Sequence, residues 1–212
     1  MRSSQNAQSN FAELLLANSN IQRSRLNTIS VHSDTRLPAH AKLLYRHVNS
    51  ANLSDILRGT LEFSNSFMAN HVFLKLAENT DSNSVSFKLA SEYAQSALGQ
   101  EFAWQKHSLI EGSGLSRANR LSASQIDDLL AVLEPNKKLF KKIKVREPNV
   151  DVYAKTGTLN GVRSYAGYID LNANDPDKRK SYRFVFNFNR SVPYRYRDTV
   201  LEQLISDLLI LK

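Results

Sequence analysis

Three segments in the last third of the chain alternate apolar and polar residues, or run apolar, in the manner of β-strands. They are residues 150–159, 163–171 and 181–189. Asn160-Gly161 separates the first two segments, and this dipeptide is a strong signal for a two-residue hairpin turn. The polar stretch 172–180 separates the second from the third. We therefore predict an antiparallel sheet built from consecutive strands.

Apolar residues recur at spacings of three and four in several segments before this sheet, which predicts helices. Ser54 is expected to cap one of them, and Ser122 with Gln125 forms a capping-box pattern for another. Gly99 is expected to end a helix that starts near Leu89. Further helices are predicted from Phe11 to about Asn18–Asn20, around Met68–Leu76 and from Asp198 to Leu211, and a strand at residues 27–32.

Helices that precede an antiparallel sheet, with one more helix after it, indicate an α+β fold. Residues 1–10 are rich in Ser, Asn and Gln, and we expect a flexible N-terminal segment there. Residues 11–212 then form one domain, with a helical region at 11–147 and the sheet and terminal helix at 148–212.

The composition excludes several kinds of site. The chain has no cysteine, so disulfides, thiol nucleophiles and thiolate metal sites are excluded. Its five histidines never fall into a zinc-binding spacing, and we expect no metal and no cofactor. No apolar run approaches the length of a membrane span, and no signal segment opens the chain.

The net charge of +8 suits a polyanionic partner or an anionic surface. Much of it lies in the run 137–146, where Phe140 is the one aromatic residue among the lysines. Binding of nucleic acid would favour more interleaved aromatic residues. We therefore expect a solvated basic face after a helix and no nucleic-acid partner.

The segment Lys155-Thr156-Gly157-Thr158 carries the candidate chemistry. On a strand, Thr156 and Thr158 share one face, and Lys155 and Gly157 share the other. An exposed strand edge can pair with an extended substrate, while an ammonium group and hydroxyls can hold a carboxylate. Gly157 allows close approach to the strand backbone. The alternative is an edge strand whose lysine serves solubility.

Two further polar segments lie upstream of this strand. Ser64-Asn65-Ser66 falls between two apolar helical stripes, where such residues usually mark a cap or a turn. The segment Gly112-Ser113-Gly114-Leu115-Ser116-Arg117 has two glycines that impose a turn, which Ser113 is expected to serve.

Together these segments and the closing hairpin and helix resemble the C-terminal part of class C penicillin-binding proteins. Those are the D-alanyl-D-alanine carboxypeptidases and endopeptidases of bacterial cell-wall metabolism. The likeness runs from about Phe11 to the C-terminus. It implies a partial penicillin-binding-protein or β-lactamase-like transpeptidase fold, with the C-terminal helix packed on the sheet.

The resemblance also implies a reaction that uses three motifs, S-x-x-K, S-D-N and K-T-G. Ser64 of the second motif would relay protons, with Asn65 and Ser66 contacting substrate. Lys155 and Thr156 would engage the substrate carboxylate beside Gly157. The backbone N–H of Thr158 would form half of an oxyanion hole.

Two departures from the family pattern stand out. Ser66 occupies the place where the second motif normally ends in Asn. The sequence also contains no S-x-x-K, so the serine nucleophile is missing. We therefore expect a C-terminal portion of a longer protein, or a relative that has lost its N-terminal half, and no covalent penicillin adduct on this chain alone.

The resemblance implies peptidoglycan stem peptides and β-lactams as partners, and a periplasmic or extracytoplasmic location with peripheral membrane or cell-wall association. A non-catalytic module that grips cell-wall peptides is the alternative. A basic anion-binding protein that uses the run 137–146 is a third possibility.

Overall fold

The computed structural model of this chain describes residues 42, 50–80 and 85–211. The chain divides into two compact units, residues 1–48 and 49–212, and the second is described here by itself. The helix predicted from Phe11 and the strand predicted at 27–32 lie outside the described residues.

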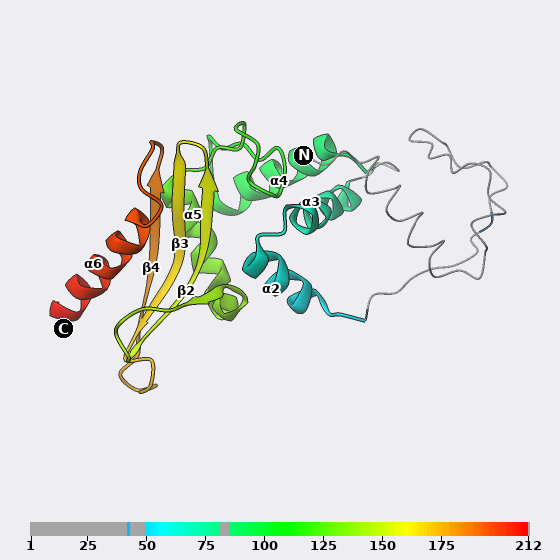
Figure 1. Cartoon of the computed structure of the whole chain (residues 1–212). Helices are drawn as coiled ribbons and strands as arrows, with labels where there is room; N and C mark the ends of the chain where they lie inside the picture. The colour runs from blue at the N-terminus through cyan, green and yellow to red at the C-terminus, as the bar shows by residue number, and fades with distance from the viewer. Residues whose placement is uncertain (1–41, 43–49, 81–84, 212) are drawn as a thin grey trace, which may run out of the picture. The chain divides into compact units, whose positions relative to one another are not determined.

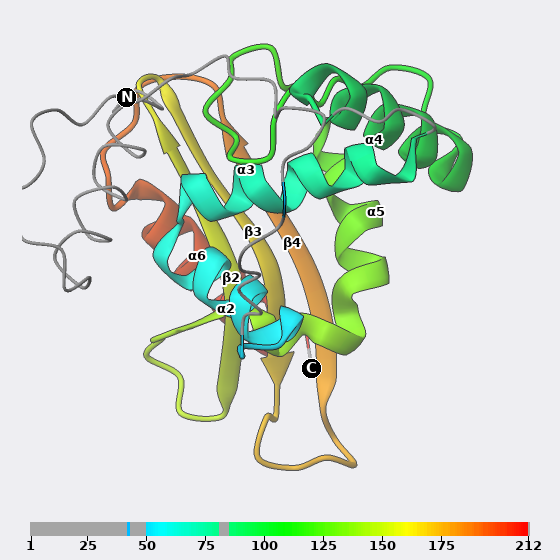
Figure 2. The ribbon, with the colours of Figure 1, turned by 90° about the vertical axis from the view of Figure 1, so that its right-hand side faces the viewer.

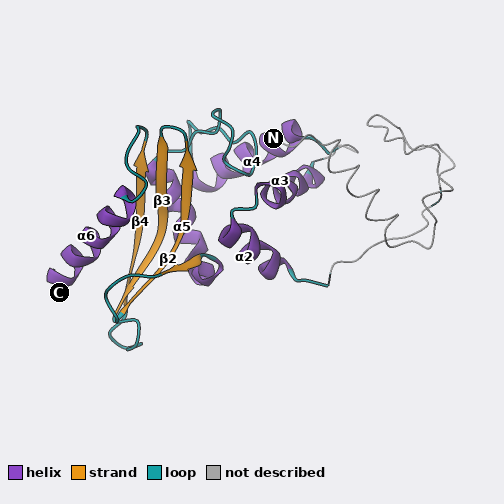
Figure 3. Cartoon of the chain, viewed as in Figure 1, coloured by secondary structure: helices purple, strands orange, loops and turns teal. Residues whose placement is uncertain are grey.

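The second unit contains a four-stranded antiparallel sheet (Figure 1 and Figure 3). Its strands are β1 (Lys141–Ile143), β2 (Val150–Leu159), β3 (Val162–Leu171) and β4 (Lys180–Phe188), in the order β1-β2-β3-β4. The Asn160-Gly161 turn joins β2 to β3 as predicted, with Gly161 at φ 70°. The three strands predicted from alternation are confirmed to within one residue at each end.

The short strand β1 covers only part of the β2 edge. It pairs with Val152–Ala154, and no described strand pairs with residues 155–159 on the side away from β3. The Lys155–Thr158 segment therefore lies on an open edge, because an unpaired strand leaves a row of main-chain groups unused.

Helices cover both faces of the sheet (Figure 2). On one face lie α2 (Leu53–Phe63), α3 (Ser66–Leu74), α4 (Phe87–Phe102) and α5 (Ala123–Leu133), and α6 (Tyr196–Ile210) packs on the opposite face. Short 3-10 helices, η2 (Lys75–Asn79) and η3 (Glu134–Leu139), extend α3 and α5. This arrangement confirms the predicted α+β class and the packing of the C-terminal helix on the sheet. Among the described residues, no helix has the length and apolarity needed to cross a bilayer.

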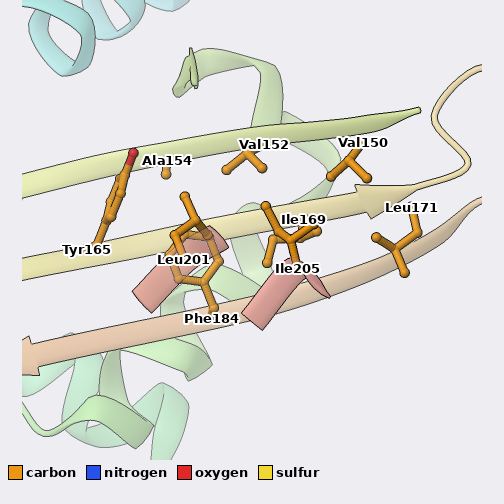
Figure 4. Packing of buried hydrophobic residues seen from close by; sticks show 9 residues of the cluster. All are labelled: Val150, Val152, Ala154, Tyr165, Ile169, Leu171, Phe184, Leu201 and Ile205. Atoms are coloured by element: carbon orange, nitrogen blue, oxygen red, sulfur yellow. The ribbon is translucent and has the colours of Figure 1, made fainter. Parts of the chain in front are cut away.

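The main core lies between the sheet and α6 (Figure 4). Even-numbered residues of β2, such as Val152 and Ala154, point toward α6 and are almost fully buried. They pack with side chains of β3 and β4 and with Leu201 and Ile205 of α6. On the other face, Tyr168 is buried between α5 and the sheet, with its hydroxyl donating to the Leu130 carbonyl at 2.6 Å. Lys155, an odd-numbered residue, belongs to this second face.

Two predicted helix ends are wrong. The cap of α2 is Asn52, whose Oδ1 accepts from the Asp55 N–H at 2.9 Å, so Ser54 lies within the first turn. Asn and Ser cap helices about equally well, and the sequence pattern could not separate them. Gly99 lies inside α4, which ends at the left-handed Ala103. A glycine costs a helix interior only about 1 kcal/mol, which tertiary packing can offset. The capping box of Ser122 is confirmed, with both of its hydrogen bonds present.

The expectation of a solvated basic face at 137–146 is also wrong in part. The Lys137 ammonium group lies 2.7 Å from the Asp170 carboxylate, and the two side chains are only 15% and 4% exposed. Phe140 is buried against Tyr168, and Lys141–Ile143 form β1. This run therefore fastens η3 and β1 to the sheet.

Candidate active site

The Ser64-Asn65-Ser66 segment forms the junction between α2 and α3. Ser64 ends α2 in the left-handed conformation, at φ 51° and ψ 46°. Asn65 caps α3, its Oδ1 accepting from the Met68 N–H at 3.1 Å. A non-glycine residue in this region costs about 1 kcal/mol or more, and such strain is often found at functional sites. The predicted helix junction is confirmed.

Lys155 reaches across from β2 to this junction. Its Nζ donates a hydrogen bond to Ser64 Oγ at 2.5 Å and to the Thr156 carbonyl at 2.8 Å. Ser64 and Lys155 are 91 residues apart in the sequence. The fold thus brings together the two residues on which the proposed site most depends.

The surroundings of Lys155 change its acidity. Burial lowers the pKa of Lys155, and the positive charges of Arg197 and Lys141 lower it further. Both hydrogen bonds of its ammonium group go to neutral oxygens. A lysine amine with a lowered pKa can accept and return a proton more readily than an ordinary lysine, and the Ser64 hydroxyl lies within hydrogen-bonding distance to pass it.

The open edge of β2 presents main-chain groups beside this pair. The Thr156 carbonyl accepts from Lys155 Nζ, so it faces the open side of the strand. Since main-chain groups alternate between the two edges of a strand, the N–H and C=O of Thr158 face the same side. The edge can therefore pair with an extended peptide, as the sequence predicts.

The threonine side chains lie on the α6 face, away from Lys155, as the two-residue period predicts. The Thr158 hydroxyl accepts a hydrogen bond from Arg197 Nη1 at 3.0 Å, so the protein already engages this oxygen. A Cβ on Gly157 would meet Ser164 Oγ at 2.1 Å. The glycine thus makes room for the hydroxyl of the paired residue on β3.

A loop at residues 111–117 forms a further wall of the site, and the Glu111 carboxylate organises it. This carboxylate accepts from the Ser113 N–H at 2.8 Å, from the Ser113 hydroxyl, from the Ser116 N–H at 3.1 Å and from Asn119 Nδ2 at 2.9 Å. Burial acts to raise the pKa of Glu111, but the hydrogen bonds outweigh it and the pKa is lowered. Ser113 serves the turn, as expected.

The loop is joined to both sides of the site. Asn70 Oδ1 on α3 accepts from the Gly112 and Ser113 N–H groups at 2.8 and 3.1 Å. A Cβ on Gly112 would lie 2.6 Å from a main-chain oxygen of α3, so this position requires glycine. Arg117 Nη2 donates to the Asn160 carbonyl at 2.6 Å, in the turn between β2 and β3. The loop therefore links the helix that follows Ser64 to the hairpin that carries Lys155.

These elements line an open cavity of about 730 Å³. Ser64, Lys155 and Thr158 lie on its wall, together with Asn65, Ser66, Thr156 and Gly157. Much of the rest is apolar and comes from α2, α5, η3 and the sheet, including Leu61, Leu129, Leu133, Phe140 and Val185. Helix α2 has no fully buried side chain, and it contributes Thr60 and Leu61 to the wall of this cavity. An apolar hollow with a few convergent polar groups is typical of a binding site.

All seven residues predicted for the site thus line one cavity, but in unequal ways. Ser64 and Lys155 are hydrogen-bonded to each other, whereas the side-chain Oδ1 of Asn65 is used to cap α3. Sequence reasoning missed Glu111, Arg117 and Arg197. Glu111 adjoins the glycine-serine turn that the sequence marks, so an acceptor for that turn could have been sought there. No local signal connects Arg117 or Arg197 with the strand.

Two of three comparisons with known proteins found a match. The model of a family described as D-Ala-D-Ala carboxypeptidase 3 (S13) matches residues 2–143. Among solved structures, the chain is similar to penicillin binding protein 4 (dacB) from Haemophilus influenzae, complexed with a novel β-lactam, with a TM-score of 0.58 and 24% sequence identity. No curated protein matches the chain.

The structural match covers 73% of this chain and 41% of the Haemophilus protein. The chain therefore spans less than half the length of that relative. The similarity confirms the expected penicillin-binding-protein-like fold.

Proposed function

The chain belongs to the D-Ala-D-Ala carboxypeptidase 3 (S13) family, and from this premise we propose that its Ser64–Lys155 site binds the D-Ala-D-Ala end of peptidoglycan stem peptides. In this proposal the site takes part in the reaction of a serine-type carboxypeptidase or endopeptidase, which proceeds through an acyl-enzyme. The observation that carries the proposal is the contact between Lys155 Nζ and Ser64 Oγ beside an unpaired strand edge.

The geometry supports a distinct role for each group. An extended stem peptide pairs with the open edge of β2 at residues 155–158. Its terminal carboxylate lies near the Lys155 ammonium group, which has no bonded carboxylate among the described residues. The Thr158 N–H faces the same side and donates to the oxyanion of the scissile carbonyl. Ser64 passes a proton between Lys155 and the leaving amine.

Two neighbouring polar residues complete the substrate contacts in this proposal. Asn65 Oδ1 caps α3, which leaves its Nδ2 group to donate to a substrate carbonyl. Ser66, the first residue of α3, stands where the family motif has an amide. The serine side chain is shorter than that of asparagine, so its contact with the substrate is weaker.

In this proposal a segment outside this sequence supplies the serine nucleophile, since the sequence contains no S-x-x-K. We place the missing segment in the apolar part of the cavity, beside Ser64 and Lys155. An apolar helix there would also contact Leu61, the apolar residue of α2 that lines the cavity.

The same reasoning sets the expected partners and location. Stem peptides and β-lactams share a carboxylate next to a reactive amide, so both suit the edge of β2. Peptidoglycan lies outside the cytoplasm, so a periplasmic or extracytoplasmic location follows from the proposal. The alternative, a non-catalytic module that grips cell-wall peptides, uses the same edge and the same lysine.

A binding experiment tests the proposal directly. The ligand is a diacetylated Lys-D-Ala-D-Ala peptide with a free C-terminal carboxylate, compared by calorimetry with the same peptide as a C-terminal amide. We expect the acid to bind and the amide to bind at least tenfold more weakly, because a charge-assisted hydrogen bond is lost. Lys155→Met should reduce the preference. Lys144→Met, which removes an exposed charge that does not line the cavity, should leave it intact.

Equal binding of the acid and the amide, or an unchanged preference in Lys155→Met, would refute the proposed role of the edge. A second assay tests whether this chain itself carries a serine nucleophile. Incubation of the chain with a fluorescent penicillin, followed by a denaturing gel, should give no labelled band, because the nucleophile is absent. A labelled band would show that another serine of this chain acts as nucleophile.

A further inference from the structure

Arg197, the second residue of α6, is buried behind the candidate site. Only 5% of its surface is exposed. Its Nη1 donates to the Thr158 hydroxyl at 3.0 Å, and its guanidinium group lies over the rings of Tyr165 and Tyr194, at 5.5 and 4.8 Å from their centroids. These contacts fix the arginine against the face of the sheet opposite Lys155.

The charge of Arg197 is poorly compensated. Among the described residues its one ion pair is with Asp198, at 3.9 Å from Nε and with a side chain that is 53% exposed. Nε itself is buried and makes no hydrogen bond within the described part of the chain. Tyr165 does not supply an anion either, because burial raises the pKa of its hydroxyl to about 12. Buried cations in proteins are usually paired, so one without a bonded carboxylate indicates a use for its charge.

We propose that Arg197 is a positioning residue of the site, which holds Thr158 from behind and supplies a permanent positive charge to an anion at the open edge of β2. This inference rests on the proposed function, since it assigns Arg197 to the same bound carboxylate or oxyanion. Arg197 does not touch the substrate, because β2 lies between them.

Two physical features support this role. The hydrogen bond from Arg197 to the Thr158 hydroxyl holds Thr158 in place. It therefore sets the direction of the Thr158 N–H, which faces the open edge. The guanidinium group remains charged at every relevant pH, whereas the Lys155 amine has a lowered pKa. Lys141 of β1 and Arg197 of α6 are the charged groups that act on Lys155. The edge therefore keeps a positive potential even where Lys155 has lost its proton.

The test compares Arg197→Met with Arg195→Met, an exposed arginine two residues earlier on the same helix end. The first readout is the pKa of the Lys155 amine, followed by NMR of the side chain without ligand. Arg197→Met should raise it, since a neighbouring positive charge is removed. Arg195→Met should leave it unchanged. The second readout is the affinity for the diacetylated Lys-D-Ala-D-Ala acid, which should fall about tenfold in Arg197→Met alone.

Two milder variants keep the inference falsifiable if Arg197→Met does not fold. Arg197→Lys retains the positive charge and should keep the pKa of Lys155 low. Thr158→Val removes the hydrogen bond between Arg197 and the Thr158 hydroxyl, and it should weaken peptide binding without raising the pKa of Lys155. If the wild-type chain binds no peptide, the proposed function fails, and the Lys155 titration alone decides whether the charge of Arg197 reaches the site. Equal Lys155 pKa values in the Arg197 and Arg195 variants would overturn the inference.

Discussion

Replacement of Glu111 by alanine should destabilise the protein through the loop at 111–117. The substitution removes four hydrogen bonds, which are donated by Ser113, Ser116 and Asn119. Each hydrogen bond contributes about 0.5–1.5 kcal/mol. Because water can reach much of this loop, we take the lower end of the range for each bond, which gives a loss of about 2 kcal/mol in unfolding free energy.

Thermal unfolding followed by circular dichroism measures this effect. For a unit of this size, a loss of about 2 kcal/mol corresponds to a fall of about 4–8 °C in Tm. Glu101→Ala is the matched control, since Glu101 is an exposed glutamate on α4. Its effect should stay within about 0.5 kcal/mol. Equal Tm values for the two variants would refute the view that the Glu111 carboxylate organises the loop.

The contribution of Glu111 should also depend on pH. The pKa of its carboxyl group is lower in the folded protein than its ordinary value of 4.5. The unfolded chain therefore binds a proton first as the pH falls. The stabilisation is fully present above 4.5 and disappears as the pH falls through the lowered folded-state pKa. The difference in stability between wild type and Glu111→Ala should shrink over that range, and a difference that grows on acidification would contradict this assignment.

Three other substitutions test the scaffold of the site. Arg117→Ala removes the bond to the β2–β3 turn and should speed hydrogen exchange at Val162, which pairs with Leu159 across that turn, whereas Arg120→Ala should not. Gly112→Ala forces a methyl group against the main chain of α3 and should reduce the unfolding free energy by about 1–3 kcal/mol. Urea denaturation measures this loss, and an unchanged unfolding free energy would refute the close packing of Gly112 on α3. Lys137→Met leaves the Asp170 carboxylate buried and unpaired, so the unfolding free energy in the same assay should fall by about 3–5 kcal/mol. A fall of less than about 1 kcal/mol would contradict a buried ion pair at this position.

The sheet could be predicted from sequence because its signals are local. Alternation in residues 150–159 fixes which side chains face α6, and Asn160-Gly161 sets the turn and hence the register with β3. The capping box at Ser122 is likewise contained within four residues. Features of this kind depend on neighbours in the chain, so a pattern can reveal them.

Other features depend on tertiary contacts and could not be read from a pattern. Gly99 remains within α4 because the helix packs on its neighbours, and Lys137 is buried because Asp170 lies opposite it on β3. The sequence marks Ser64 and Lys155 as candidates, but their contact spans 91 residues and only the fold shows it. Arg197 meets Thr158 across 39 residues, from a helix whose pattern indicates core packing alone.

The most direct test of the central claim is the titration of the Lys155 amine with and without peptide. If the open edge of β2 holds a substrate carboxylate beside this lysine, addition of the diacetylated Lys-D-Ala-D-Ala acid should raise the pKa of Lys155 toward its ordinary value, because a bound anion favours the ammonium form. The C-terminal amide should not raise it. A Lys155 pKa that does not respond to the acid, or responds equally to both peptides, would contradict the account.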